Sequence, residues 1–123
     1  MPHVVIPVRG GGMLSYADEV WQREQILLVL LPADGSPAWG RFLEALAQEQ
    51  PRLRAQETVL VVSEGSVGGF DPPLALVADR WGEITHASRL TIRGGEVTPD
   101  VPTLLTWVDA TLFRCPECEG EAY

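Results

Sequence analysis

Two cysteines near the C-terminal end of the sequence are the side chains best suited to chemistry. They form the motif Cys115-Pro116-Glu117-Cys118 and are the only cysteines among 123 residues. A Cys-x-x-Cys spacing suits a dithiol that cycles with a disulfide, and it also suits one half of a tetrahedral zinc site. The motif therefore leaves open thiol–disulfide exchange, zinc binding and a purely structural role.

The surroundings of this motif do not favour a reactive pair. Catalytic dithiols lie at a helix N-terminus, where the helix dipole stabilises the thiolate. Cys115 and Cys118 instead follow the last predicted helix and stand beside two glutamates. A zinc ion would need further ligands from His3, His86 or a second subunit, which would give a zinc-bridged dimer. In the structural interpretation, Cys115 packs on the helix and Cys118 lies in a charged tail, residues 116–123.

Ser36 is the other candidate for chemistry, because it opens a predicted helix directly after an apolar strand. A serine hydroxyl attacks a substrate only when a neighbouring base removes its proton. The two histidines, His3 and His86, occur in no recognisable triad pattern. Ser36 followed by Pro37 is also a common helix start, with the serine as N-cap. The capping role is favoured, and Trp39 is expected to pack in the core or at its rim.

The strands that position these residues follow from apolar and β-branched runs. The continuously apolar run 26–31 is typical of a central strand covered on both faces. A strand at 4–8 contains Pro7, which cannot donate to a ladder, so we expect it at a sheet edge. Further strands are expected at 58–63, 74–78 and 84–92. The last two form an antiparallel hairpin, with Gly82 supplying a positive φ in the turn.

Three helices are predicted from capping signals and helical spacing. A short one is expected at 14–20, where Ser15 and Asp18 resemble a capping box. A last helix opens at Asp100 and carries an apolar stripe that ends at Cys115. Strand, helix and strand in succession imply a parallel pair, and the helices are expected on both faces of the sheet. The clearest helix runs from Ser36 to near Pro51 and should bury Trp39, Phe42, Leu43, Leu46 and Ala47.

Composition limits the classes of function. The net charge of −8 repels phosphate backbones and anionic lipid, which disfavours nucleic-acid and membrane-surface roles. The longest strongly apolar run is too short to cross a bilayer, and the N-terminus does not resemble a secretory signal. We therefore expect a cytoplasmic domain, residues 1–123, with an N-terminal extension at 1–25 and a C-terminal tail at 116–123. Its expected partner is a protein, including a second copy of the chain.

The order of elements resembles the thioredoxin-like superfamily, nearest its peroxiredoxin-like or redoxin branch. The resemblance rests on Leu14-Ser15-Tyr16, on residues 31–43, and on residues 72–84 with two prolines, an apolar strand and a charged turn. It implies an α/β fold with a mixed four- or five-stranded sheet flanked by helices.

Carried over by position, the resemblance makes three residues informative. Ser36 stands where the family has its attacking cysteine, Trp39 where it has its resolving cysteine, and Pro73 where it has a cis-proline beside the helix start. Pro72 departs from the pattern, because it removes a backbone N–H close to where a substrate strand docks.

The missing cysteines decide which function is preferred. Disulfide exchange requires a thiolate, so the family's chemistry is not expected at Ser36 and Trp39. The preferred function is a non-catalytic binding or regulatory module that uses the surface around Ser36, Trp39 and Pro73, without a cofactor. The alternatives are a thiol–disulfide oxidoreductase that uses Cys115 and Cys118, and a zinc-bridged dimer through the same pair.

Overall fold

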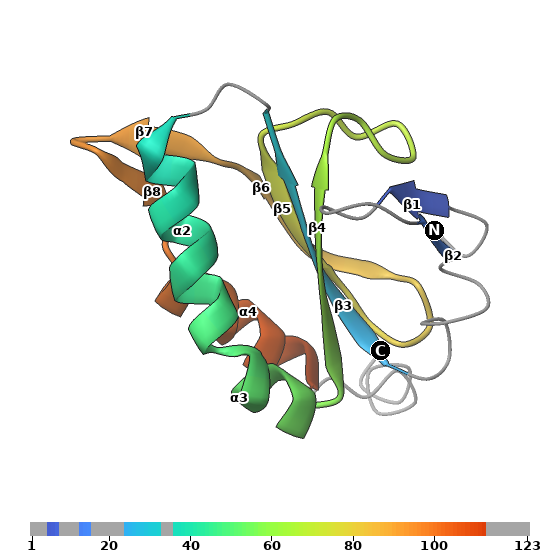
Figure 1. Ribbon diagram of the computed structural model, residues 1–123. Coiled ribbons are helices and arrows are strands. Elements are labelled where there is room, and N and C mark those ends of the chain that lie inside the picture. The colour runs from blue at the N-terminus through green and yellow to red at the C-terminus, as the bar shows by residue number, and fades with distance from the viewer. Residues whose placement is uncertain (1–4, 8–12, 16–23, 33–35, 113–123) are drawn as a thin grey trace, which may run out of the picture.

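A mixed four-stranded sheet forms the centre of the protein. The computed structural model describes residues 5–7, 13–15, 24–32 and 36–112. The sheet has the strand order β4-β3-β5-β6, with β3 parallel to β4 and the other neighbours antiparallel (Figure 1). The predicted mixed sheet is therefore confirmed. Its strands are β3 (Gln25–Leu31), β4 (Thr58–Glu64), β5 (Leu74–Ala78) and β6 (Ile84–Arg89).

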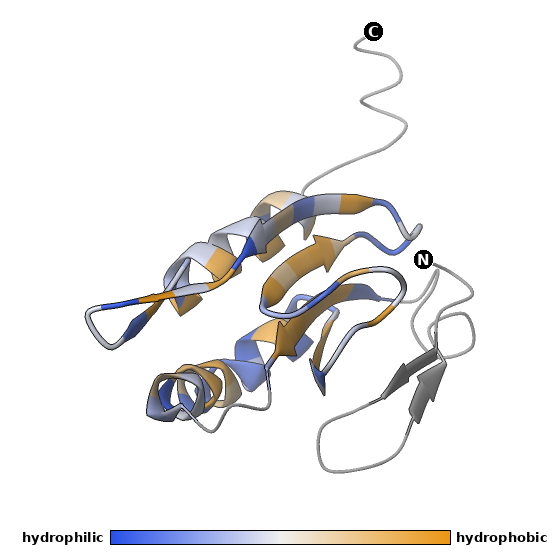
Figure 2. Cartoon of the chain, turned by 90° about the horizontal axis from the view of Figure 1, so that it is seen from above, coloured by the Kyte–Doolittle hydropathy of each residue, from blue (hydrophilic) through white to orange (hydrophobic). Residues whose placement is uncertain are grey.

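The central strand β3 is buried along its whole length, because it lies between two strands and between two apolar layers. Successive side chains of a strand point to opposite faces. Leu27, Val29 and Leu31 join the apolar cluster on the helix side. Ile26, Leu28 and Leu30 join a second cluster on the other face. Figure 2 shows the hydrophobic residues concentrated in these central strands.

Three helices lie on one side of the sheet, and the β1–β2 hairpin lies on the other (Figure 1). The prediction of helices on both faces is therefore wrong for the described residues. The second apolar cluster includes Val67 and, at its margin, Phe70, both from the loop after β4. The helices are α2 (Pro37–Gln48), α3 (Gln50–Ala55) and α4 (Val101–Leu112).

The prediction of a helix at 14–20 is wrong for its first two residues, Leu14 and Ser15. Residues 13–15 form β2 (Met13–Ser15), which pairs antiparallel with β1 (Val5–Pro7) in a separate two-stranded sheet. Pairing with β1 overrides the local capping signal at Ser15. The rest of that predicted helix, residues 16–20, lies outside the described residues, whereas the strand expected around Val5 is confirmed.

The boundaries of the first long helix differ from the prediction at its C-terminal end. The helix α2 ends at Gln48, and Pro51 lies in the first turn of α3 rather than after a single longer helix. Proline is tolerated there because a first-turn N–H has no helical partner. Ala47, expected on the buried face, is exposed, and Leu43 is partly buried.

The strand expected at 84–92 is divided at Leu90. β6 ends at Arg89, and a second hairpin follows, made of β7 (Thr91–Arg93) and β8 (Glu96–Thr98). Leu90 is buried, and its N–H donates to the carbonyl oxygen of Pro73 at 3.2 Å, which extends the β5–β6 register by one pair. Pro73 has no N–H to return the bond, so the ladder ends there. None of the described helices has the length and apolar character needed to cross a membrane.

Candidate functional site

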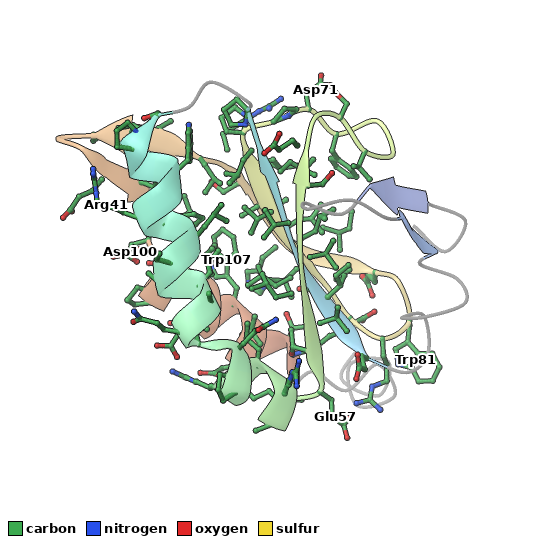
Figure 3. The ribbon with its side chains drawn as sticks, in the orientation of Figure 1. Arg41, Glu57, Asp71, Trp81, Asp100 and Trp107 are labelled. Carbon is green, nitrogen blue, oxygen red and sulfur yellow. The ribbon has the colours of Figure 1, made fainter. Side chains whose placement is uncertain are left out.

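The candidate site lies at one end of the sheet, where β3 ends and β5 begins. These strands are antiparallel, and Leu30 pairs with Leu74. Pro73 directly precedes Leu74, while α2 opens at Pro37 a few residues after β3 ends. The register thus places Pro73 and the start of α2 at the same end of the sheet, as expected from the resemblance. Figure 3 shows Asp71 at this end and Trp81 and Glu57 at the opposite end.

Ser36 occupies the predicted N-cap position of α2. Its backbone is extended, with φ −62° and ψ 131°, and its carbonyl oxygen accepts a hydrogen bond from the N–H of Trp39 at 3.2 Å. Its hydroxyl makes no capping hydrogen bond, so the side chain does not satisfy the orphan N–H groups of the first turn. Proline at the first helical position still favours a helix start here, because its φ is already helical.

His86 lies far from Ser36 along the sheet. It pairs with Val77, which in turn pairs with Leu27, four residues before the end of β3. That offset corresponds to roughly 13 Å of strand. The His86 ring stacks on Trp107 with a centroid distance of 5.5 Å and an interplanar angle of 12°, and its Nδ1 lies 3.1 Å from the hydroxyl of Thr85. This arrangement does not place His86 as a base for Ser36.

Trp39 is part of the hydrophobic core. Its exposed fraction is 7%, and it belongs to the same cluster as Phe42 of α2, Leu104 of α4 and Val29 of β3. The prediction that Trp39 packs in the core is confirmed. The indole therefore supports the start of α2 from inside and offers little surface to a ligand.

The peptide bond between Pro72 and Pro73 is cis, as the resemblance implied for Pro73. The carbonyl oxygen of Asp71 accepts a hydrogen bond of 2.6 Å from Nη1 of Arg89, and that of Pro73 accepts from Leu90 N–H. The two prolines have no N–H to donate. Of the three carbonyl oxygens of residues 71–73, only that of Pro72 is left outside these two hydrogen bonds. An extended ligand would also find no backbone N–H donor at the two prolines.

Arg89 and Asp71 were missed by sequence reasoning. The carboxylate of Asp71 also accepts a hydrogen bond of 2.5 Å from the Ser66 hydroxyl, which joins the loop after β4 to the proline loop. Ser66 and Asp71 lie in the same connection between β4 and β5, whereas Arg89 comes from β6, so the sequence gives no spacing that links all three. The signal that could have pointed to Arg89 was its place at the end of a strand predicted to pair with the strand after Pro73.

The β7–β8 hairpin borders the site on the side of α2. Nη2 of Arg41, in the second turn of α2, donates to the carbonyl oxygen of Gly95 at 2.6 Å, and Val97 of β8 is buried in the core. Gly94 and Gly95 have φ of 58° and 79°, which glycine adopts without the penalty of a Cβ. A Gly-Gly pair between alternating residues is a hairpin signal that the sequence interpretation passed over.

The remaining candidates fall outside the described part of the chain. Cys115, Cys118 and His3 lie outside the described residues, so the three interpretations of the cysteine motif stay predictions. Within the described ranges, no group of three or more His, Cys, Asp or Glu side chains is placed to hold a metal ion. The zinc hypothesis therefore rests on the sequence alone.

Comparison with known proteins establishes the fold. Neither family models nor curated proteins give a significant match to the sequence. Among solved structures, one described as the thiol:disulfide interchange protein DsbE of Chlorobium tepidum superposes with a TM-score of 0.63 at 14% identity, covering 88% of this chain and 92% of that one. An uncharacterised thioredoxin-like protein of Porphyromonas gingivalis superposes with a TM-score of 0.60 at 14% identity, covering 91% of each chain. The chain has a thioredoxin-like fold.

Proposed function

We propose that this chain is a thioredoxin-fold binding module that performs no thiol–disulfide exchange at the start of α2. One observation carries the proposal: the cap of α2 holds the hydroxyl of Ser36, and the position three residues later holds a core indole, Trp39. In the fold that this chain resembles, the attacking and resolving sulfur atoms stand at these positions. Neither replacement can accept or release electrons as a dithiol does.

The proposed binding surface is the end of the sheet that contains Ser36 and Pro73. The two prolines provide no N–H, and two of the three carbonyl oxygens of residues 71–73 are already bonded. A partner that added a strand here would leave its own backbone groups without partners, which is costly once they are buried. We therefore propose recognition through side chains, with the exposed charged side chains of Asp71 and Arg89 at the rim.

An activity assay tests the absence of catalysis. The protein is mixed with insulin and dithiothreitol, and reduction of the insulin disulfides is followed as turbidity, with hydrogen peroxide consumption measured in parallel. We expect rates equal to those without protein. The matched control is the double variant Cys115→Ser, Cys118→Ser, which removes every thiol of the chain.

The two alternatives make different predictions in the same experiment. Turnover that is lost in the double serine variant would establish the oxidoreductase and overturn the binding-module proposal. The oxidoreductase alternative is retained because the similar structure from Chlorobium tepidum is described as a thiol:disulfide interchange protein. Bound zinc in the purified protein, released together with dissociation of a dimer by chelator, would establish the zinc-bridged form. The cytoplasmic location belongs to the proposal as well and is tested by fractionating the source cells.

A further inference from the structure

The outer edge of β4 is the longest open strand edge in the described part of the chain. β4 ends the main sheet, and no described strand is hydrogen-bonded to its outer side. Strand β1 contacts β4, but its backbone hydrogen bonds are made to β2. In Figure 1 the sheet is seen from this edge, with α2 and α3 on one side and the β1–β2 hairpin on the other. An open edge of this length can pair with another strand.

The sequence of β4 has none of the usual features that prevent an edge strand from pairing with another chain. Between Thr58 and Glu64 the strand reads Val-Leu-Val-Val-Ser, without charge, proline or glycine. Leu60 and Val62 are only partly buried on the helix side. Lysines, prolines and bulges are the features by which natural edge strands avoid pairing. Their absence here points to an edge that is used.

A cavity of about 410 Å³ lies beside the first half of this edge. It is lined by Thr58, Val59 and Leu60 of β4, by Gln50 and Arg54 of α3, and by Glu24. The other two arginines near this region have carboxylate partners, Arg52 with Asp109 and Arg80 with Glu57, whereas Arg54 has none within the described ranges. The first half of the edge thus offers a cavity lined by the positive charge of Arg54 and the negative charge of Glu24.

We propose that two copies of this chain pair antiparallel through β4, about a twofold axis at Val61, to give a continuous eight-stranded sheet. The axis is normal to the sheet, so residues that face each other share the same face. Leu60 then meets Val62 of the second copy, which buries partly exposed apolar surface. In this register each residue of one copy faces a residue of the other copy: Thr58 faces Glu64, Val59 faces Ser63, Leu60 faces Val62, and the two Val61 residues face each other.

Charge complementarity selects a second copy as the occupant. In this register the Glu64 carboxylate of one copy lies opposite Thr58 of the other, on the helix face, where Arg54 lines the same cavity. The twofold axis repeats the contact, so each dimer has two Arg54–Glu64 contacts. Glu24 also lines the cavity and weakens this attraction. The proposal is independent of the proposed function, because the β4 edge is not part of the surface at Ser36 and Pro73.

The test is a charge swap at the exposed residues Arg54 and Glu64, measured by sedimentation equilibrium from about 1 µM to about 1 mM. Chelator and reductant are present throughout. We expect Arg54→Glu and Glu64→Arg each to raise the dimer dissociation constant about tenfold, and the double variant to restore it to within about threefold. Glu24→Gln should lower the dissociation constant. Amide hydrogen exchange of Leu60 and Val62, whose N–H groups face away from β3, should slow as the protein concentration rises.

Four outcomes would overturn the proposal. The first is a protein that stays monomeric over the whole concentration range. The second is a dimer that forms only without chelator or reductant, which would place the contact at the cysteine motif. The third is a double variant as weak as the singles. The fourth is slow exchange of Leu60 and Val62 already in the monomer, which would mean that the edge is filled within one chain. Circular dichroism of each variant verifies that the fold is retained.

Discussion

Arg89, at the end of β6, donates a hydrogen bond of 2.6 Å from Nη1 to the backbone carbonyl oxygen of Asp71. The next residue, Leu90, donates its N–H to the carbonyl oxygen of Pro73. The end of β6 therefore holds both sides of the Pro72–Pro73 peptide. This pair of contacts shapes the loop at residues 71–73, and it does so with groups far apart in the sequence.

The first prediction concerns this contact. Replacing Arg89 by alanine leaves the carbonyl oxygen of Asp71 with solvent as its partner, so the free energy of unfolding should fall by about 0.5–1 kcal/mol, as for an exposed bond to a charged group. Urea unfolding measures the loss, and hydrogen exchange at the Leu90 amide should accelerate. Arg93→Ala, on the exposed strand β7, is the matched control and should change stability by less than about 0.5 kcal/mol. Equal effects of both changes would contradict a specific role for Arg89.

The second prediction separates core packing from ligand binding at Trp39. Trp39→Ala should lower the free energy of unfolding by about 3–5 kcal/mol, because it leaves a cavity beneath α2. That loss approaches the total stability of a marginal domain, so Trp39→Phe, with an expected loss of about 1–2 kcal/mol, is measured beside it. Trp81→Phe at a 53% exposed position is the control and should cost less than about 0.5 kcal/mol. A neutral Trp39→Phe would show that the indole is not a packing residue.

The third prediction tests whether the start of α2 still favours a thiolate. In a background with Cys115 and Cys118 changed to serine, Ser36→Cys places a lone thiol at the N-terminus of α2, where the helix dipole favours its ionised form. Ala110→Cys places a matched thiol on the exposed last turn of α4, where the dipole acts in the opposite sense. The thiol at position 36 should react with an aromatic disulfide reagent at pH 7 roughly three- to thirtyfold faster. A slower reaction at position 36 would show that the framework no longer activates sulfur.

The fourth prediction concerns Asp100, which caps α4. Its Oδ1 accepts hydrogen bonds from the side chain of Thr103 at 2.7 Å and from the Thr103 N–H at 3.0 Å, and these bonds hold the pKa of the carboxyl below its usual value. Because the pKa is lower in the folded state, the stabilisation is complete above about pH 4 and is lost as the pH falls through the folded pKa.

Two substitutions at this cap separate its charge from its hydrogen bonds. Asp100→Ala should lower the free energy of unfolding at pH 7 by about 1 kcal/mol, and Asp100→Asn should lower it by less, since asparagine also caps helices. Urea unfolding at pH 7, 5 and 3 provides the measurement. The difference between the native protein and Asp100→Asn should shrink between pH 5 and pH 3, and a difference that grew over this range would contradict the assignment.

Several parts of the site were predictable because they depend on local sequence. A continuous apolar run identified β3, and Ser36 with Pro37 identified the start of α2, since neighbouring residues alone decide these features. The parallel pairing of β3 with β4 followed from the strand–helix–strand order and its chirality. The burial of Trp39 followed from helical spacing. Each of these required only a few consecutive residues.

Other parts depend on contacts between distant segments and were missed or wrong. The β5–β6 ladder ends at Leu90 because its partner Pro73 has no N–H to donate, and residues 14–15 form a strand because β1 pairs with them. A local pattern cannot specify either partner, since a propensity describes one segment and a hydrogen bond requires two.

The sequence by itself determined the class of fold and the absence of cysteines at the start of the first long helix, because residue types and local periodicity are sufficient for both. Only the tertiary structure decided which face the helices cover, that no described strand pairs with the outer edge of β4, and that Arg89 holds the proline loop. These features depend on strand order and register, and those are selected by the packing of the whole chain rather than by any one segment.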